Sequence, residues 1–179
     1  MKLTSRGWAS VVLPCLLTIA SGWVMAQCAD GNLNPAIESS AALSEFNDNG
    51  DGTLAHRRTR LVWQRCALGQ IWDGAGCAGL PSQLDWTAAL LAAESHSQAG
   101  RDDWRLPNRN ELASIIEGRC FSPALDSDAF PNATLTAYWS STPVSGGGEQ
   151  VWVVELLDGG VIPLATDTLQ SVRLVRGGE

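Results

Sequence analysis

The stretch DDWRLPNRNEL, residues 102–112, decides the fold of this 179-residue chain. Its second half has the pattern of a helix start, because the Asn108 side chain after Pro107 can accept from the free N–H groups of a first turn. Glu111, three residues after Asn108, completes a capping box. The residues expected on the buried face of this helix and at its end are Leu112, Ile115, Ile116 and Gly118.

The first half of the stretch is predicted to be structural. Trp104 and Leu106 lead into the helix as packing residues, because aromatic and aliphatic side chains dominate core burial. Arg105 lies between them, with aspartates at 102–103 and Glu111 nearby. We predict a buried or half-buried guanidinium that is satisfied by carboxylates or backbone carbonyls.

A second helix is predicted at DWTAALLAAESH, residues 85–96, with Asp85 as its N-terminal cap. Its apolar stripe consists of Trp86, Ala89, Leu90 and Ala93. Upstream, TLAHRRTRLVWQR at 53–65 is predicted to form a strand in which Leu54, Leu61 and Trp63 are buried.

The pattern becomes β after Cys120. Strands are predicted at 137–141, 150–157, 161–165 and 171–176, with a hairpin turn at 158–160. Pro163 should place its strand at a sheet edge or a bulge. These elements predict an α+β domain in which two helices pack on antiparallel strands.

The first 26 residues have the pattern of a signal peptide. Lys2 and Arg6 precede an apolar run at 11–20, and residues 24–26 resemble a small-residue cleavage site. The run is shorter than the ~20 residues of a spanning helix, so no stable membrane insertion is expected after cleavage. We therefore expect an exported chain, periplasmic or secreted to the cell surface, with an irregular arm at 27–45 and one domain at 46–179.

The chain after residue 26 is acidic. Without Lys2 and Arg6, the twelve basic residues become ten arginines against nineteen carboxylates, a net charge of −9. An acidic surface argues against nucleic acid and anionic membranes as partners, and less strongly against sulfated polysaccharide.

Four cysteines remain after residue 26, a number typical of two disulfides in an exported chain. None of them has the pair spacing of zinc ligands. The Gly-rich span between Cys66 and Cys77 favours a bond between these two. Cys28 would then pair with Cys120 and tie the arm to the end of the second helix.

Nine short motifs, in order, resemble the Lcl C-terminal domain family, which is named after a collagen-like adhesin that carries such a domain. The motifs span residues 46–178 and are FNDNGDGTL, TRLVWQRC, WDGAGC, DWTAAL, DWRLPNRNELASIIEGRC, SPALDSDAFPN, YWSST, VWVVELLDGG and VRLVRGG. HRRTR at 56–60 departs from the usual family pattern, and the Asn/Tyr-rich tail of some relatives is missing.

A more distant resemblance, through the tryptophan-led helix and the Arg105-Leu106-Pro107 motif, is to formylglycine-generating-enzyme-like domains. It implies a C-type-lectin-like fold stapled by disulfides. The enzyme chemistry does not carry over, because it needs reactive cysteines late in the chain and none follows Cys120. The calcium-dependent sugar motifs of true C-type lectins are also missing.

No catalytic arrangement stands out. His56 and His96 are the only histidines, and neither lies in a pattern typical of a serine hydrolase. We expect a non-catalytic binding or adhesion module on a lectin-like scaffold, recognising glycan or a surface protein. The alternative is a structural or assembly subunit of an envelope or surface complex, which would include contact with its own copies.

A binding surface, if present, is predicted in the C-terminal half, from about residue 138 to 170. The candidate ligand-binding residues are Tyr138, Ser141, Glu149, Gln150, Trp152 and Asp158. Trp139 is expected in the core, whereas Tyr138 and Trp152 fit either role. The arginine-rich segment 57–65 is the next place to look.

The segment NDNGDG, residues 47–52, resembles the first half of a calcium loop. Asn47, Asn49 and Asp51 supply alternating oxygens, but position 12 is Arg58 instead of a bidentate glutamate. We prefer a hairpin turn, since Asn-Gly and Asp-Gly are common tight-turn pairs. Weak calcium binding is the one cofactor that the sequence leaves open.

Overall fold

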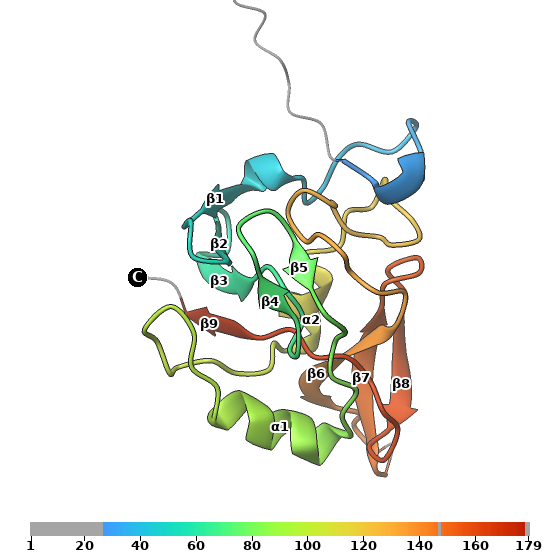
Figure 1. Ribbon diagram of the computed structural model, residues 1–179. Helices are drawn as coiled ribbons and strands as arrows, with labels where there is room; N and C mark the ends of the chain where they lie inside the picture. The colour runs from blue at the N-terminus through green and yellow to red at the C-terminus, as the bar shows by residue number, and fades with distance from the viewer. Residues whose placement is uncertain (1–26, 147, 178–179) are drawn as a thin grey trace, which may run out of the picture.

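The computed structural model describes residues 27–146 and 148–177 (Figure 1). The predicted signal peptide, residues 1–26, lies outside the described residues. Within these ranges no helix has the length and apolarity needed to cross a membrane. The segment 27–45 contains two short 3-10 helices, η1 (Ala29–Gly31) and η2 (Leu43–Glu45).

The described chain is a mixed α+β structure with two α-helices and three antiparallel sheets, as predicted at this coarse level. One sheet has the order β1-β2-β3-β9 and joins Phe46–Asp48, Thr53–His56, Leu61–Gln64 and Val175–Gly177. A second has the order β6-β7-β8 and joins Ala137–Pro143, Gln150–Glu155 and Val161–Ala165. The strands β4 (Ile71–Trp72) and β5 (Cys77–Ala78) form a small hairpin.

The segment 53–65 is two strands, so the single strand predicted there is wrong. Residues 57–60 form a turn that pairs β2 with β3, and Arg60 in it has a φ of +58°. Glycine or asparagine would normally mark such a left-handed position, and neither is present here. The turn between β1 and β2 does carry its glycines, Gly50 and Gly52, both at positive φ.

Both helices start where predicted. Asp85 caps α1 (Trp86–Glu94) by accepting from the Ala88 N–H at 2.8 Å. Asn108 and Glu111 form the full capping box of α2 (Arg109–Ala113). The helix α2 ends at Ala113, five residues before the predicted Gly118, and the Ser114 hydroxyl donates back to the Glu111 carbonyl. Leu90 of α1 is exposed rather than buried, because the covered face of this helix runs through Ala89 and Ala93.

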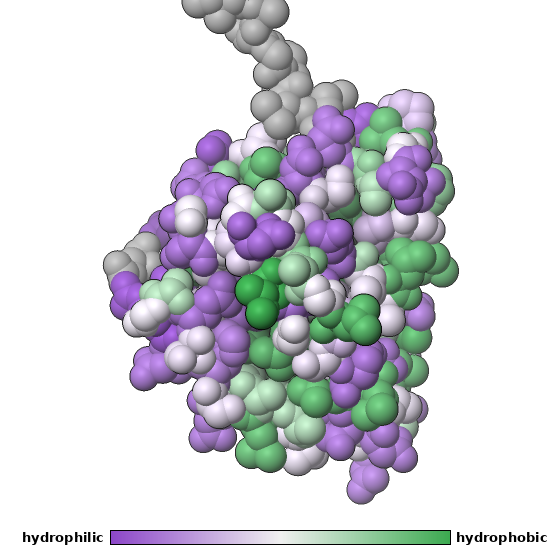
Figure 2. All heavy atoms as spheres, in the orientation of Figure 1, coloured by the Kyte–Doolittle hydropathy of each residue, from purple (hydrophilic) through white to green (hydrophobic). Residues whose placement is uncertain are grey.

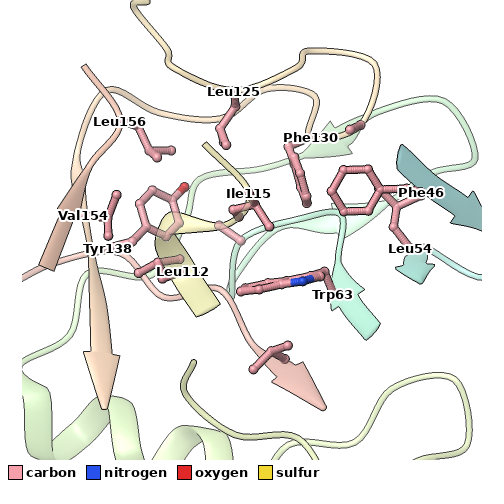
Figure 3. Close-up of a cluster of buried hydrophobic side chains, with 13 residues drawn as sticks. Phe46, Leu54, Trp63, Leu112, Ile115, Leu125, Phe130, Tyr138, Val154 and Leu156 are labelled. Carbon is pink, nitrogen blue, oxygen red and sulfur yellow. The ribbon is translucent and has the colours of Figure 1, made fainter. Parts of the chain in front are cut away.

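The β6-β7 pair has a hydrophobic cluster on each face. Tyr138 and Val154 belong to one cluster, while their neighbours Trp139 and Val153 belong to the other. Figure 3 shows the first cluster, in which Tyr138 and Val154 face Leu112 of α2. Successive side chains of a strand point to opposite faces, so both faces of this sheet are core. Pro163 lies on β8, an edge strand, as predicted.

Both predicted disulfides are present, Cys66–Cys77 and Cys28–Cys120. The second joins the 27–45 segment to the loop after α2 rather than to the helix itself, because the helix ends early. Two buried carboxylates reinforce this attachment. Glu117 accepts from residues 39–41, and Asp126 accepts from the backbone N–H groups of Gln27 and Leu43.

Candidate functional site

One hollow on the molecule is lined by four arginines, and we call it the arginine groove. It has a volume of about 460 Å³ and is bounded by the β1-β2 turn, β2, the β2-β3 turn, residues 99–101 and β9. Its charged and polar lining residues are Asn47, Asn49, Asp51, Thr53, His56, Arg57, Arg60, Arg101 and Arg176. Four guanidinium groups therefore share this hollow with a single carboxylate.

Local contacts position the arginines. The Arg57 Nε donates to the Asn47 Oδ1 at 2.9 Å. Arg176 lies 3.8 Å from the Asp103 carboxylate, with its guanidinium above the Trp104 ring. Arg60 occupies the left-handed turn position, and no hydrogen bond or ion pair joins its guanidinium to the rest of the described chain. A non-glycine residue at positive φ is strained, and such strain gathers at functional sites.

His56 lies beneath these arginines and is fully buried. Its ring stacks on Phe46 at 4.8 Å, and its Nδ1 lies 2.8 Å from the Thr59 hydroxyl. The Nε2 atom has no hydrogen-bond partner among the described residues. Burial lowers the pKa of His56, as does nearby Arg58, while Glu45 opposes the shift. His56 is therefore a neutral ring beneath the groove, and its burial keeps it from direct contact with a ligand.

The predicted calcium residues also line this groove, where they make other contacts. Asn47 faces Arg57, and the Asp51 carboxylate accepts from the backbone N–H and hydroxyl of Thr53. The Asn49 amide donates to the same hydroxyl. The segment is the hairpin turn we preferred, and its surroundings are cationic. No cluster of three or more His, Cys, Asp or Glu suited to a metal occurs in the described ranges.

The stretch at 102–112 has a structural role, and Arg105 is the residue in it that differs from the prediction. Trp104 and Leu106 are buried as predicted, and Pro107 at the helix start is buried as well, but the Arg105 side chain is 46 % exposed. Its guanidinium makes a bidentate pair with Glu111, both distances being 2.8 Å. The backbone of Arg105 makes paired hydrogen bonds with Val175 of β9. The side chain therefore leaves the core between its two buried neighbours.

The candidate residues of the C-terminal half do not form one site. Tyr138 is 1 % exposed and cannot contact a ligand, because α2 and the first core cluster cover it. Trp139 is core, as expected. Ser141 is tied to the Pro107 carbonyl by its backbone N–H and its hydroxyl. Asp158 lies in the turn after β7, whereas Gln150 begins that strand, so the two are at opposite ends of the β7-β8 hairpin.

Glu149 and Gln150 line a separate hollow of about 320 Å³, together with Trp86 of α1. Trp152 is half-buried on β7, where the Arg109 guanidinium lies 5.2 Å from its ring centre. Trp86 was expected to be structural, and it does pack, partly buried, against the second core cluster. Its position at a hollow is a feature that the helical pattern alone did not indicate.

Sequence reasoning found only part of the arginine groove. The segment 57–65 was singled out for its arginines, but Arg65 in it is structural. The Arg65 guanidinium pairs with Asp48, donates to the backbone at 128–129 and stacks on Trp72. The other two groove arginines, Arg101 and Arg176, come from distant segments that no local pattern connects to this turn.

The chain is similar to a known protein family. The family model of the Lcl C-terminal domain matches residues 52–176, which covers most of the described chain. The search of curated proteins gave no significant match. The matched range contains both α-helices, seven of the nine strands (β2 to β8) and the first two residues of β9. The chain therefore belongs to the Lcl C-terminal domain family.

Proposed function

We propose that this chain is an exported, non-catalytic binding module that holds an acidic glycan in the arginine groove. The observation that carries the proposal is the convergence of four arginines on one hollow with a single carboxylate. Guanidinium groups present planar pairs of N–H donors that match carboxylates. An anionic group on the ligand would be attracted to this hollow.

The remaining lining groups support a sugar over a bare anion. Asn47 and Asn49 line the groove with exposed side-chain amides, which can donate to and accept from hydroxyl groups. Such groups match the hydroxyls of a sugar that bears a carboxylate. The chain is acidic outside the groove, with a formal net charge of −7 over its full length. A densely charged polyanion would be repelled by this surface, so sparse charge on the ligand is favoured.

We also propose that the scaffold is of the C-type-lectin-like kind implied by the sequence resemblance. Two helices beside antiparallel sheets support that assignment, as does the pairing of the last strand with the sheet that contains the first. Export, to the periplasm or the cell surface, is supported by two disulfides in a chain with a signal-peptide pattern. Residues 46–179 would form the binding domain and 27–45 its attached arm.

The assembly-subunit alternative has less support. Large exposed apolar side chains such as Ile71, Leu80, Leu91 and Leu169 come from separate parts of the chain. Figure 2 shows the apolar residues on one face interspersed with hydrophilic ones. A dedicated assembly surface would be expected to show a broad continuous apolar patch.

The proposal is tested by calorimetric titration of the purified protein with trigalacturonate. Arg60→Ala should weaken binding about tenfold or more, since a hydrogen bond to a charged group contributes roughly 1.5–3 kcal/mol. Arg58→Ala is the matched control, because it removes the same charge from the same turn without lining the groove.

Equal losses in the two variants would show a general charge effect and contradict the proposed site. Stronger binding of hexaglutamate than of trigalacturonate would reassign the ligand from a glycan to an acidic protein segment. The variants therefore test where the ligand binds, and the two ligands test which class of molecule binds.

A further inference from the structure

The hollow that contains Trp86, which we call the Trp86 hollow, is separate from the arginine groove. Its volume is about 320 Å³, and it shares no lining residue with the groove. The hollow is formed where the start of α1 meets the ends of β6, β7 and β8. A ligand in this hollow would therefore contact a different set of side chains from a ligand in the arginine groove.

Backbone hydrogen bonds hold the walls of this hollow together. The Thr166 carbonyl accepts from the Trp86 N–H at 3.0 Å, and the Thr166 N–H donates to the Glu149 carbonyl at 2.9 Å. The Val144 N–H donates to the Gln150 carbonyl at 2.9 Å. The two bonds of Thr166 join segments that are far apart in the sequence, so the hollow is preformed and a ligand would not have to order it.

The indole of Trp86 is held in one orientation. Its Nε1 donates to the Ser140 carbonyl at 3.0 Å, while the ring remains only partly buried. Pro143 and Val151 extend the apolar part of the wall. A fixed, partly open aromatic ring beside aliphatic carbon is a surface on which the C–H face of a pyranose can stack.

The polar side chains around this ring have no hydrogen-bond partner among the described residues. The carboxylate of Glu149, the amide of Gln150 and the hydroxyls of Thr87 and Thr166 make no hydrogen bond to any other described residue. Such groups can accept from and donate to adjacent sugar hydroxyls. Glu149 is also the only charged residue in the lining, so an anionic ligand would be repelled.

We propose that the Trp86 hollow is a second carbohydrate site, specific for an uncharged pyranose unit. The sugar ring stacks on Trp86, and two neighbouring hydroxyls donate to the Glu149 carboxylate. The site does not depend on the arginine groove, because neither its residues nor its ligand charge are shared with it. A chain with both sites could hold a glycan that carries acidic and neutral units, or two glycans.

The test is nuclear magnetic resonance of the ¹⁵N-labelled protein during titration with methyl pyranosides of glucose, galactose, mannose and N-acetylglucosamine. The indole N–H signal of Trp86, identified by its loss in Trp86→Phe, should shift with at least one of these sugars. Galacturonate should leave that signal in place. Glu149→Gln should weaken the sugar titration about tenfold, because it replaces a charged acceptor.

Asp158→Asn is the matched control, since it neutralises an exposed acid at the opposite end of the same hairpin. It should leave the titration unchanged. The proposal is overturned if no methyl pyranoside shifts the Trp86 signal, or if Glu149→Gln and Asp158→Asn weaken binding equally. A shift of the Trp86 signal with galacturonate alone would also overturn it, and it would count against the arginine groove as the site for acidic sugars.

Discussion

Glu111 holds two parts of the stretch at 102–112 together. Its carboxylate accepts from both nitrogens of the Arg105 guanidinium and from the Asn108 N–H at 2.7 Å. The hydrogen bond from Arg105 is the largest cause that lowers the pKa of Glu111. A lowered pKa in the folded state adds stability above the unfolded pKa of about 4.3, and this stability is lost as pH falls through the folded pKa.

We therefore expect Glu111→Ala to lower the free energy of unfolding by about 1–2 kcal/mol at pH 7, from the cap and the ion pair together. Arg105→Ala should cost less, about 0.5–1 kcal/mol, because this pair is exposed. Urea unfolding at pH 7 and at acidic pH measures both variants. The Glu111→Ala difference should shrink in acid, and a larger loss for Arg105→Ala would contradict the exposed pairing.

His56 should also make the folded protein less stable as pH falls, in the range near neutrality. Its pKa is lowered by burial first and then by Arg58, so the unfolded chain takes up the proton more readily than the folded one. Stability should therefore fall as pH drops below the unfolded value of about 6.5. Thermal unfolding of the protein and of His56→Gln should show this loss only in the former. A flat profile in both would show that His56 is not buried as a neutral ring.

Single residues were predicted best where local chemistry decides their role. The caps Asp85 and Asn108 follow from side-chain hydrogen bonding within one turn, and the sequence identified both. Tyr138 and Arg105 depend on what other segments cover, which no local pattern reveals. Tyr138 is buried because both faces of β6 are core, and Arg105 is exposed because only its backbone pairs with β9.

Among the elements, the error at 53–65 has a clear origin. The turn at 57–60 lacks glycine, proline and asparagine, the residues that mark tight turns in a sequence. Its left-handed position is taken by Arg60, a residue of the proposed site. The local rule therefore fails at the position where the groove is built, which is where a functional requirement can outweigh turn preference.

The segment 27–45 is attached by buried acids as well as by a disulfide. The Asp126 carboxylate accepts from the backbone N–H groups of Gln27, Leu43, Asp128 and Ala129. Burial is the largest influence on the pKa of Asp126 and raises it, against these bonds. An amide in place of the carboxylate could accept at only one of the two positions.

We expect Asp126→Asn to lower the free energy of unfolding by about 2–3 kcal/mol, since buried N–H groups would lose their acceptor. Faster hydrogen exchange of residues 27–45 should accompany the loss. Asp128→Asn is the control, because that neighbouring side chain is exposed. Equal exchange rates in the two variants would mean that the Cys28–Cys120 bond alone holds the segment.

For the whole molecule, the main result is a local reversal of charge. The chain is acidic overall, yet four of its arginines gather where β2, the β2-β3 turn, residues 99–101 and β9 meet. The composition predicted the acidic surface, but it does not show whether arginines gather at one place on that surface. Arg101 and Arg176 reach the groove only because β9 pairs with β3 and the 99–101 loop lies beside it, and that arrangement depends on long-range pairing.

The role of the arginine groove is tested most directly by mapping where trigalacturonate binds. In the ¹⁵N-labelled protein, the signals that shift should be those of the arginine side chains of the groove. The shifts should weaken with added salt, because exposed charges are screened. Shifts confined to the Trp86 hollow, or no shift at any concentration, would contradict the central claim that the arginine groove is the binding site for an acidic glycan.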